Sequence, residues 1–485
     1  MVISLFTTRL VLNSLGASDF GIFNLVGGAI AMLAFLNACL AGSTQRFLSF
    51  AEGEGNILHI KQVFNVSIIL HASMAVLVGI ALTIFGIVFF NSMINIPSSR
   101  FTAAIIVYAS LVISTIITII SVPYDAVINA HENMMYYAIV GVIESLLKLF
   151  VALCVVYTSL DKLIVYGILM ALIPFIITLL MRIYCHRHYK ECKIQPKKYW
   201  NGKLVKQMAS FSGWSLLDAI SGIVGANSLS IILNNFFGTL LNAAQGVANQ
   251  VGGQLSSFSR SMIKAITPVI TKSEGAGERN SMLYYSIIGS KYAYLLLAVF
   301  AIPFFLEADF ILTIWLKTVP DWAVLFCQLQ LISILFTQLT VNLWSSISAT
   351  GDVKHFYICK SIVNSMPMVL TWICFYFNMQ PYWMYIVSII CNGVINSIII
   401  IYFAMKKCSL KIFDFLKDAI YPVCITTAIS LAMGVLGDFA FEESYSRLFI
   451  TCFLSFFGFG LGYWITCKNG EKTAIKTMLN KILHK

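Results

Sequence analysis

Charge is scarce in this chain, and that scarcity is the first constraint on what the protein can be. Only 11% of its 485 residues are Asp, Glu, Lys or Arg, whereas 59% are hydrophobic. Soluble domains carry about 25% charged residues, and no soluble fold could bury so much apolar surface. The composition therefore predicts a protein whose surface faces lipid.

Several sequence signatures are also missing. No Ala-x-Ala-like site follows the first apolar run, so we predict no cleaved signal peptide. No G-x-x-x-x-G-K-[ST] sequence occurs that could form an ATP-binding P-loop. The 12 cysteines are mostly scattered singly and predict no disulfide framework. One cluster, Cys185, His186, His188 and Cys192, matches no zinc-ligand spacing, and we predict neither a metal nor a cofactor.

Long apolar runs dominate what is present. They have about 20 residues, the length that a helix needs to cross a hydrocarbon core, and Gly, Pro, Asn and charges separate them. Barrel strands would be about half as long and would alternate polar with apolar residues. We therefore predict an all-α integral membrane protein of about 14 transmembrane helices. The predicted spans are Met1–Leu15, which is short for a crossing, Phe20–Leu48, Val66–Asn91, Thr102–Val122, Tyr136–Tyr157, Leu163–Tyr184, Met208–Phe236, Ala243–Ile266, Leu283–Phe305, Trp322–Ile347, Tyr357–Phe377, Trp383–Phe403, Ala419–Leu436 and Leu448–Ile465.

The basic residues predict the orientation. Most of the 32 Lys and Arg residues fall in loops on one side of these spans, and only four fall in the opposite loops: Arg100, Lys162, Lys317 and Arg447. The positive-inside rule then places both termini in the cytoplasm. This asymmetry explains the net charge of +11 without a nucleic acid partner.

A short internal similarity suggests a repeat. The segment AEGEGN (Ala51–Asn56) resembles SEGAGERN (Ser273–Asn280), and each follows the second helix of its half. A shift of six helices keeps the orientation, so we predict two parallel six-helix lobes around a central cleft. The predicted domains are residues 1–204 (helices 1–6), 205–405 (helices 7–12) and 406–485 (helices 13–14 and a cytoplasmic tail).

Ionisable residues inside the spans are costly, at about 2.5–3.5 kcal/mol each, and so indicate function. The predicted eighth helix carries a polar stripe at three- or four-residue spacing that ends in two cations, which favours a helix lining a wet cleft or packing as a polar seam. The stripe comprises Gln245, Asn249, Gly253, Ser256, Arg260 and Lys264. Across all spans, cations outnumber anions and predict selection of anions: Arg9, Arg46, Lys148, Arg260, Lys264 and Lys291 stand against Asp125, Glu144 and Asp218.

Two carboxylates are candidates for ion coupling. Glu144 stands four residues before Lys148, so the two either form a structural pair or serve coupling. Asp218 has no partner nearby in the sequence and is the better candidate to bind a proton or another cation.

Five blocks of sequence are familiar. The chain resembles polysaccharide-biosynthesis flippases of the Wzx type, within the multidrug/oligosaccharidyl-lipid/polysaccharide (MOP) superfamily, over nearly its whole length. The blocks are TRLVLNSLGASDFGIFNLVGGAIAMLAFLNACLAGSTQRFLSFAEGEGN (8–56), SVPYDAVINAHENM (121–134), FSGWSLLDAI (211–220), LNAAQGVANQV (241–251) and EADFILTIWLKTVPDW (307–322). Sequences of this family usually carry further residues before the first block, which leaves open whether helix 1 is complete.

The resemblance implies two six-helix lobes in an inverted V, plus two C-terminal helices. It implies a flippase of the bacterial inner membrane that moves undecaprenyl-pyrophosphate-linked oligosaccharide to the periplasmic leaflet for O-antigen, capsule or exopolysaccharide synthesis. Related lipid II flippases use cavity arginines on helices 1, 2 and 8, where Arg9, Arg46 and Arg260 lie, matched by helix and not by an aligned motif. Asp218 stands where similar sequences more often have a small or uncharged residue, so the resemblance implies no coupling role for it.

The alternative functions are also functions of membrane proteins, but they involve a different activity. A MATE-like multidrug or cation antiporter of the same superfamily would need acidic cavity residues, for which Asp218 and Glu144 are the candidates. A polymerase or ligase would usually carry a large charged outer loop, which this chain lacks, so we expect no enzyme. The expected partners are the lipid-linked oligosaccharide (undecaprenyl pyrophosphate), membrane lipids and a coupling H⁺ or Na⁺ or the membrane potential, and we expect a monomer.

Overall fold

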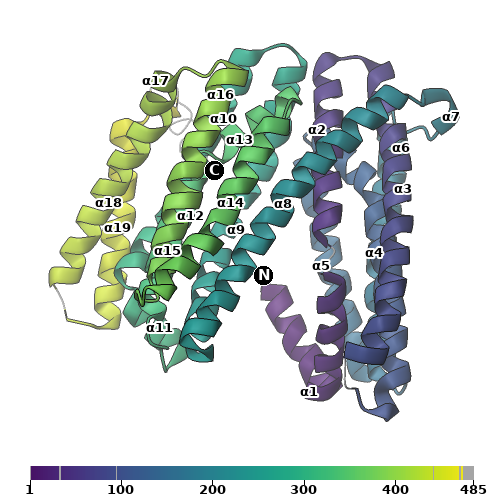
Figure 1. The fold of residues 1–485 in the computed structure, drawn as a ribbon, viewed down its shortest axis with the longest axis horizontal. Coiled ribbons are helices and arrows are strands. Elements are labelled where there is room, and N and C mark those ends of the chain that lie inside the picture. The colour runs from purple at the N-terminus through teal and green to yellow at the C-terminus, as the bar shows by residue number, and fades with distance from the viewer. Residues whose placement is uncertain (1, 32–33, 94–95, 441, 469–470, 473–485) are drawn as a thin grey trace, which may run out of the picture. The chain divides into compact units, whose positions relative to one another are not determined.

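The fold is known from a computed structural model, which describes residues 2–31, 34–93, 96–440, 442–468 and 471–472 (Figure 1). These residues form helices and no strand. Eleven helices are long and apolar enough to cross a membrane, or up to twelve if a bent pair at residues 10–28 is one span. The protein is therefore a multi-span helical membrane protein, as the composition predicts, while the number fourteen stays a prediction.

The chain divides into two compact units. The first comprises Met1–Leu216 with Gly275–Gly277, and the second comprises Leu217–Glu274 with Glu278–Lys485. The first unit contains α1 (Val2–Ala31), α2 (Ala34–Glu54), α3 (Ile57–Val88), η1 (Phe89–Met93), η2 (Ser98–Arg100), α4 (Phe101–Ala130), α5 (Met134–Tyr157), α6 (Lys162–His188), α7 (Pro196–Tyr199) and the start of α8 (Gly202–Phe237).

Helix α4 is the packing centre of the first unit, where it contacts α2, α3 and α6. Val107 of α4 is fully buried, and Gly167 of α6 lies so close that an added Cβ would stand 2.8 Å from Val107 Cγ2. The missing side chain therefore lets the two helices approach closely. Arg100 of η2 links three segments, because it donates to Asp161, which caps α6, at 2.5 Å and also pairs with Asp19 of α1.

The first helix is broken. Gly16 has φ +78°, a left-handed conformation that glycine adopts without a steric penalty. The helix axis bends by 115° between the segments 10–16 and 18–28. Residues 2–15 of the first predicted span thus lie in the first arm of α1, and the second arm begins at Ser18. The predicted span Phe20–Leu48 falls partly in this second arm and partly in α2.

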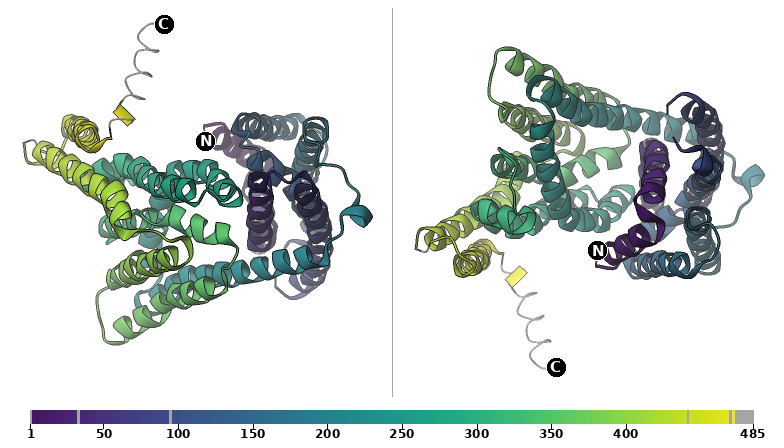
Figure 2. Two further views of the ribbon diagram at one scale, coloured as in Figure 1. Left: turned by 90° about the horizontal axis from the view of Figure 1, so that it is seen from above. Right: turned by 90° about the horizontal axis from the view of Figure 1, so that it is seen from below.

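The second unit is built around α10. It contains the rest of α8, α9 (Thr239–Gly275), α10 (Arg279–Leu306), α11 (Ala308–Leu316), α12 (Ala323–Gln338), α13 (Val341–Thr350), α14 (Lys354–Tyr376), α15 (Trp383–Ser388), η3 (Ile389–Ile395), α16 (Asn396–Cys408), α17 (Ile412–Phe415), η4 (Leu416–Ile420), α18 (Tyr421–Ala440) and α19 (Tyr445–Thr466). Helix α10 contacts α12, α13, α18 and α19, and α18 and α19 lie side by side in each view (Figure 2). Segment η3 is a π-helical turn between α15 and α16, a distortion common at functional sites.

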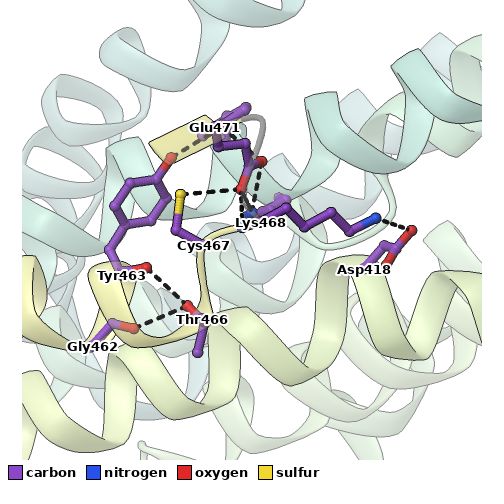
Figure 3. A network of polar contacts seen from close by, with 9 residues as sticks. Asp418, Gly462, Tyr463, Thr466, Cys467, Lys468 and Glu471 are labelled. Carbon is purple, nitrogen blue, oxygen red and sulfur yellow. Dashed lines mark hydrogen bonds and ion pairs between the residues drawn. The ribbon is translucent and has the colours of Figure 1, made fainter. Parts of the chain in front are cut away.

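A polar network fastens the residues after α19 to this unit. Lys291 of α10 is 1% exposed and donates to both carboxylate oxygens of Glu471, at 2.9 and 3.0 Å. The same carboxylate accepts bonds from Cys467 Sγ and from the main-chain N–H of Lys468, whose ammonium pairs with Asp418 at 2.7 Å (Figure 3). Lys291 is therefore a buried, paired lysine.

Candidate functional site

The predicted polar stripe lies on α9, and its first two members reach a cavity inside the second unit. Gln245 is buried and donates through Nε2 to Met384 Sδ at 3.8 Å, and Asn249 is exposed at the cavity wall. The cavity has a volume of about 250 Å³ and is bounded by α8, α9, α12, α14, α15 and η3. Its lining residues are Gly222, Gly225, Ala226, Leu229, Gln245, Asn249, Gln330, Ser333, Asn364, Pro367, Met384, Tyr385, Ser388 and Asn392.

Close packing shapes this cavity. Helix α8 contacts α14 at Gly225, where an added Cβ would lie 2.5 Å from the main-chain oxygen of Asn364. Beside the cavity, Phe326, Ala244 and Tyr385 belong to one buried apolar cluster. The helices that carry the lining residues are therefore closely packed against one another.

Asp218 has a partner that lies far away in the sequence. Its carboxylate accepts hydrogen bonds from Lys360 Nζ at 2.7 and 2.8 Å and from Asn364 Nδ2 at 2.9 Å. The side chains of Asp218 and Lys360 are 12% and 17% exposed. The carboxylate is thus neutralised by an ammonium and held by an amide that also lines the cavity.

Two polar groups of the cavity wall lack hydrogen-bond partners within the described part of the chain. They are the hydroxyl of Tyr385, a residue that is 3% exposed, and the amide oxygen of Asn392 on η3. Buried polar groups are normally hydrogen-bonded to protein or water. Both atoms are themselves buried, so neither is accessible from the cavity in this conformation.

The basic end of the α9 stripe lies elsewhere. Arg260 is exposed and donates to the main-chain oxygen of Gly253 at 2.7 Å, and no carboxylate pairs with it among the described residues. Lys264 is half-buried on the same helix. Neither residue lines the cavity, so the stripe divides into a neutral part and a cationic part.

Two further predicted cations belong to the first unit. Arg46 of α2 lies among aromatic rings, with its guanidinium carbon 4.6 Å from the ring centres of Phe47 and Phe50 and 5.9 Å from that of Phe211. Such cation–π contacts stabilise a guanidinium away from water. Arg9 falls within α1, but its side chain lies outside the described part of the structure.

Two lysines of the predicted cation set, Lys148 and Lys291, are paired. Lys148 donates to Glu144 at 2.6 Å, so the predicted pair forms, and both side chains are nearly half exposed. Lys291 binds Glu471, which stands after the last predicted span. These contacts neutralise Lys148 and Lys291, so the positive charge of the remaining set rests mainly on arginines.

Sequence reasoning missed several of these residues. Lys360 is absent from the predicted cation set, although Lys360 and Asn364 stand four apart on one face, as do Ser388 and Asn392. That spacing within apolar spans was the available signal. It also missed His71 in the first unit, a fully buried side chain whose Nε2 lies 3.0 Å from Thr44 Oγ1.

Comparisons with known proteins identify the fold. No family profile and no curated protein matches the chain. Among solved structures, an outward-facing multidrug resistance MATE family transporter of the MOP superfamily has 14% identity and a TM-score of 0.72, over 84% of this chain and 92% of that one. A MATE in complex with MaL6 has 14% identity and a TM-score of 0.69, over 84% and 94%.

The chain has the fold of a MATE transporter. A further neighbour with the MATE fold is a MOP superfamily transporter from Pyrococcus furiosus, for which reverse polarity of the binding pocket suggests a different function. Its identity is 14% and its TM-score 0.68, over 84% of this chain and 94% of that one. These neighbours are transporters and not enzymes, and at such identities the likeness concerns the fold and not the cargo.

Proposed function

We propose that the protein is a MOP-superfamily flippase that moves undecaprenyl-pyrophosphate-linked oligosaccharide from the cytoplasmic to the periplasmic leaflet of a bacterial inner membrane. In this mechanism, arginines hold the pyrophosphate, the sugars cross in a polar passage and the polyprenyl chain stays in lipid. The driving force is an ion gradient or the membrane potential, because the sequence has no P-loop.

The distribution of charge carries the proposal. The candidate carboxylates Asp218 and Glu144 each bind a lysine, whereas the guanidinium of Arg260 is exposed and binds a main-chain oxygen. A guanidinium keeps its charge at any physiological pH and offers paired donors that fit a diphosphate. The exposed guanidinium of Arg260 therefore suits an anion better than a cation.

Arg46 fits the same role through its surroundings. The rings of Phe47, Phe50 and Phe211 exclude water from one side of its guanidinium. Electrostatic attraction strengthens where water is excluded. We propose that Arg9, Arg46, Arg260 and Lys264 each bind the anionic part of the cargo, and that Asp218 and Glu144 take no part in ion coupling while their lysine pairs are intact.

Substitution of Arg260 tests the proposal. Loss of a charge-assisted hydrogen bond costs about 1.5–3 kcal/mol, so Arg260→Ala should lower flipping about 10- to 100-fold. Arg260→Lys keeps the charge, loses the planar fork and should fall between wild type and Arg260→Ala. The measurement is surface polysaccharide in cells whose own copy is replaced, with Arg187→Ala, an exposed arginine at the end of α6, as the control. Full surface polysaccharide in both Arg260 variants would contradict the proposal.

A multidrug or cation antiporter is the second candidate, because solved MATE transporters share the fold. A cationic cargo needs an acidic group in the passage, and Asp218 would supply one only after release from Lys360. The two candidates separate in a deletion strain. Loss of surface glycan with unchanged drug susceptibility supports the flippase, and the reverse pattern supports the antiporter.

A further inference from the structure

The cavity of the second unit is polar and yet carries no charged lining residue. Its polar groups are amides (Gln245, Asn249, Gln330, Asn364 and Asn392) and hydroxyls (Ser333, Tyr385 and Ser388). Amides offer donors and acceptors together, and a hydroxyl can act as either. This is the complement that a sugar ring requires, because each sugar hydroxyl also both donates and accepts.

Other ligand classes fit less well. A cation would need a carboxylate, but Asp218, which bonds to the lining residue Asn364, is also bound to Lys360. An anion would need a positively charged side chain, and Arg260 does not line the cavity. The small residues Gly222 and Ala226 and the side chain of Met384 provide an apolar wall, against which the C–H face of a sugar ring can pack.

The size of the cavity agrees with one sugar ring. Its volume of about 250 Å³ lies near the lower end of ligand pockets, which begin at about 300 Å³. A single water needs only about 10–15 Å³. The exposed amide of Asn249 supplies a group to which such a ring could bond.

The polar wall is also held in place. Asn364 donates to Asp218 at 2.9 Å, and its amide oxygen accepts from Asn396 Nδ2 at 3.4 Å. With both ends of its amide engaged, Asn364 presents a fixed surface to the cavity. A fixed wall suits recognition, because little ordering is needed when a ligand arrives.

We propose that this cavity binds one uncharged sugar ring of the transported glycan, as a subsite separate from the arginines. The inference rests on the proposed function and extends it, because it assigns glycan recognition to neutral groups of α9, α12, α14, α15 and η3. Gln245 and Asn249 are then sugar-binding residues, and Arg260 acts on the pyrophosphate.

Binding of four lipids to the purified protein tests this assignment. The probes are undecaprenyl pyrophosphate alone and the same lipid carrying one N-acetylglucosamine, one glucose or one galactose. We expect at least one sugar-bearing lipid to bind about tenfold more tightly than the bare lipid. Gly222→Leu, at a position where an added Cβ meets nothing within 4 Å, should fill the cavity and abolish this difference while affinity for the bare lipid changes less than about twofold.

Conservative variants keep the test independent of folding. Asn249→Ala removes an exposed amide from the cavity wall, and it should weaken the sugar-bearing lipid about two- to tenfold. Gly141→Leu and Asn235→Ala, at exposed positions away from the cavity, are the matched controls and should change nothing. Arg260→Ala should weaken all four lipids by the same factor.

Each failure has a separate signature. Equal binding of all four lipids to the wild type, or equal weakening of bare and sugar-bearing lipid by Gly222→Leu, would overturn the sugar subsite and leave the flippase standing. Absence of binding by every lipid would overturn the flippase and the subsite together.

Discussion

At the scale of the residue, the pair formed by Asp218 and Lys360 should contribute strongly to stability. Both side chains are mostly buried, so Lys360→Met would leave a desolvated carboxylate without its counter-charge. We expect the free energy of unfolding to fall by about 3–5 kcal/mol, and the double variant with Asp218→Leu to recover most of the loss. The measurement is denaturant unfolding in detergent.

The pair formed by Glu144 and Lys148 is the matched control for that experiment. Its geometry is similar, at 2.6 Å, but its side chains are 42% and 45% exposed. Lys148→Met should therefore cost less than about 1 kcal/mol. Equal losses for Lys360→Met and Lys148→Met would show that burial does not govern the contribution of these pairs.

The same two pairs explain what the sequence could predict about the site. Glu144 and Lys148 lie four apart on one helix, so their contact follows from helix geometry alone. The partner of Asp218 stands on α14, and only the tertiary packing of α8 against α14 brings the two together. Local spacing therefore predicts a contact within a helix, and it cannot predict whether a lone intramembrane charge is neutralised from elsewhere.

At the scale of the element, the polar stripe of α9 was correctly placed on one helix, but it does not form one site. Asn249 and Arg260 are 11 residues apart, which corresponds to about 16 Å along a helix. Gln245 and Asn249 reach the cavity, and Arg260 stands beyond its wall. Periodicity gives the face of a helix, whereas the extent of a cavity depends on neighbouring helices that the sequence does not place.

The segment after α19 offers a pH test at the same scale. Burial raises the pKa of Glu471, but hydrogen bonds from Lys291, the Lys468 main chain and Tyr292 outweigh it, and the pKa lies below its ordinary value of 4.5. A carboxylate with a lowered pKa in the folded state stabilises the fold above its unfolded pKa, and this stabilisation disappears as the pH falls through the folded pKa. The contribution of Glu471 to stability should therefore be fully present from neutral pH down to about 4.5 and decline below it.

Glu471→Gln isolates this contribution. The variant cannot balance the charge of Lys291, which is 1% exposed, so it should be less stable than wild type at pH 7. The difference should narrow below pH 4.5, because the wild-type carboxylate then becomes neutral as well. Thermal unfolding of both proteins across this range is the measurement, and a difference that is independent of pH would contradict the assignment to Glu471.

At the scale of the whole molecule, the helical membrane architecture could be predicted because lipid demands long apolar helices. The predicted number of crossings, about fourteen, stays a prediction, because α2 and α9 carry many polar residues and a break at Gly16 divides α1. The fold does not identify the transported molecule. Transporters with the MATE fold match this chain at only 14% identity, and the charge and polarity of individual side chains must separate the candidates.

Transport of an anionic lipid should depend on the membrane potential. A cargo with net negative charge that leaves an electrically negative cytoplasm moves downhill, by about 2.3 kcal/mol per charge for each 100 mV. This corresponds to about a 50-fold bias per charge. In proteoliposomes with a valinomycin-imposed potential, flipping of undecaprenyl pyrophosphate should therefore accelerate when the loaded side is negative and slow when the polarity is reversed. A pH gradient imposed at equal potassium on both sides, with valinomycin holding the potential near zero, should not change the rate. A rate that follows the pH gradient and ignores the potential would mean that protons neutralise the moving charge, and a protonatable group such as His71 or a released Asp218 would then have to take part in coupling.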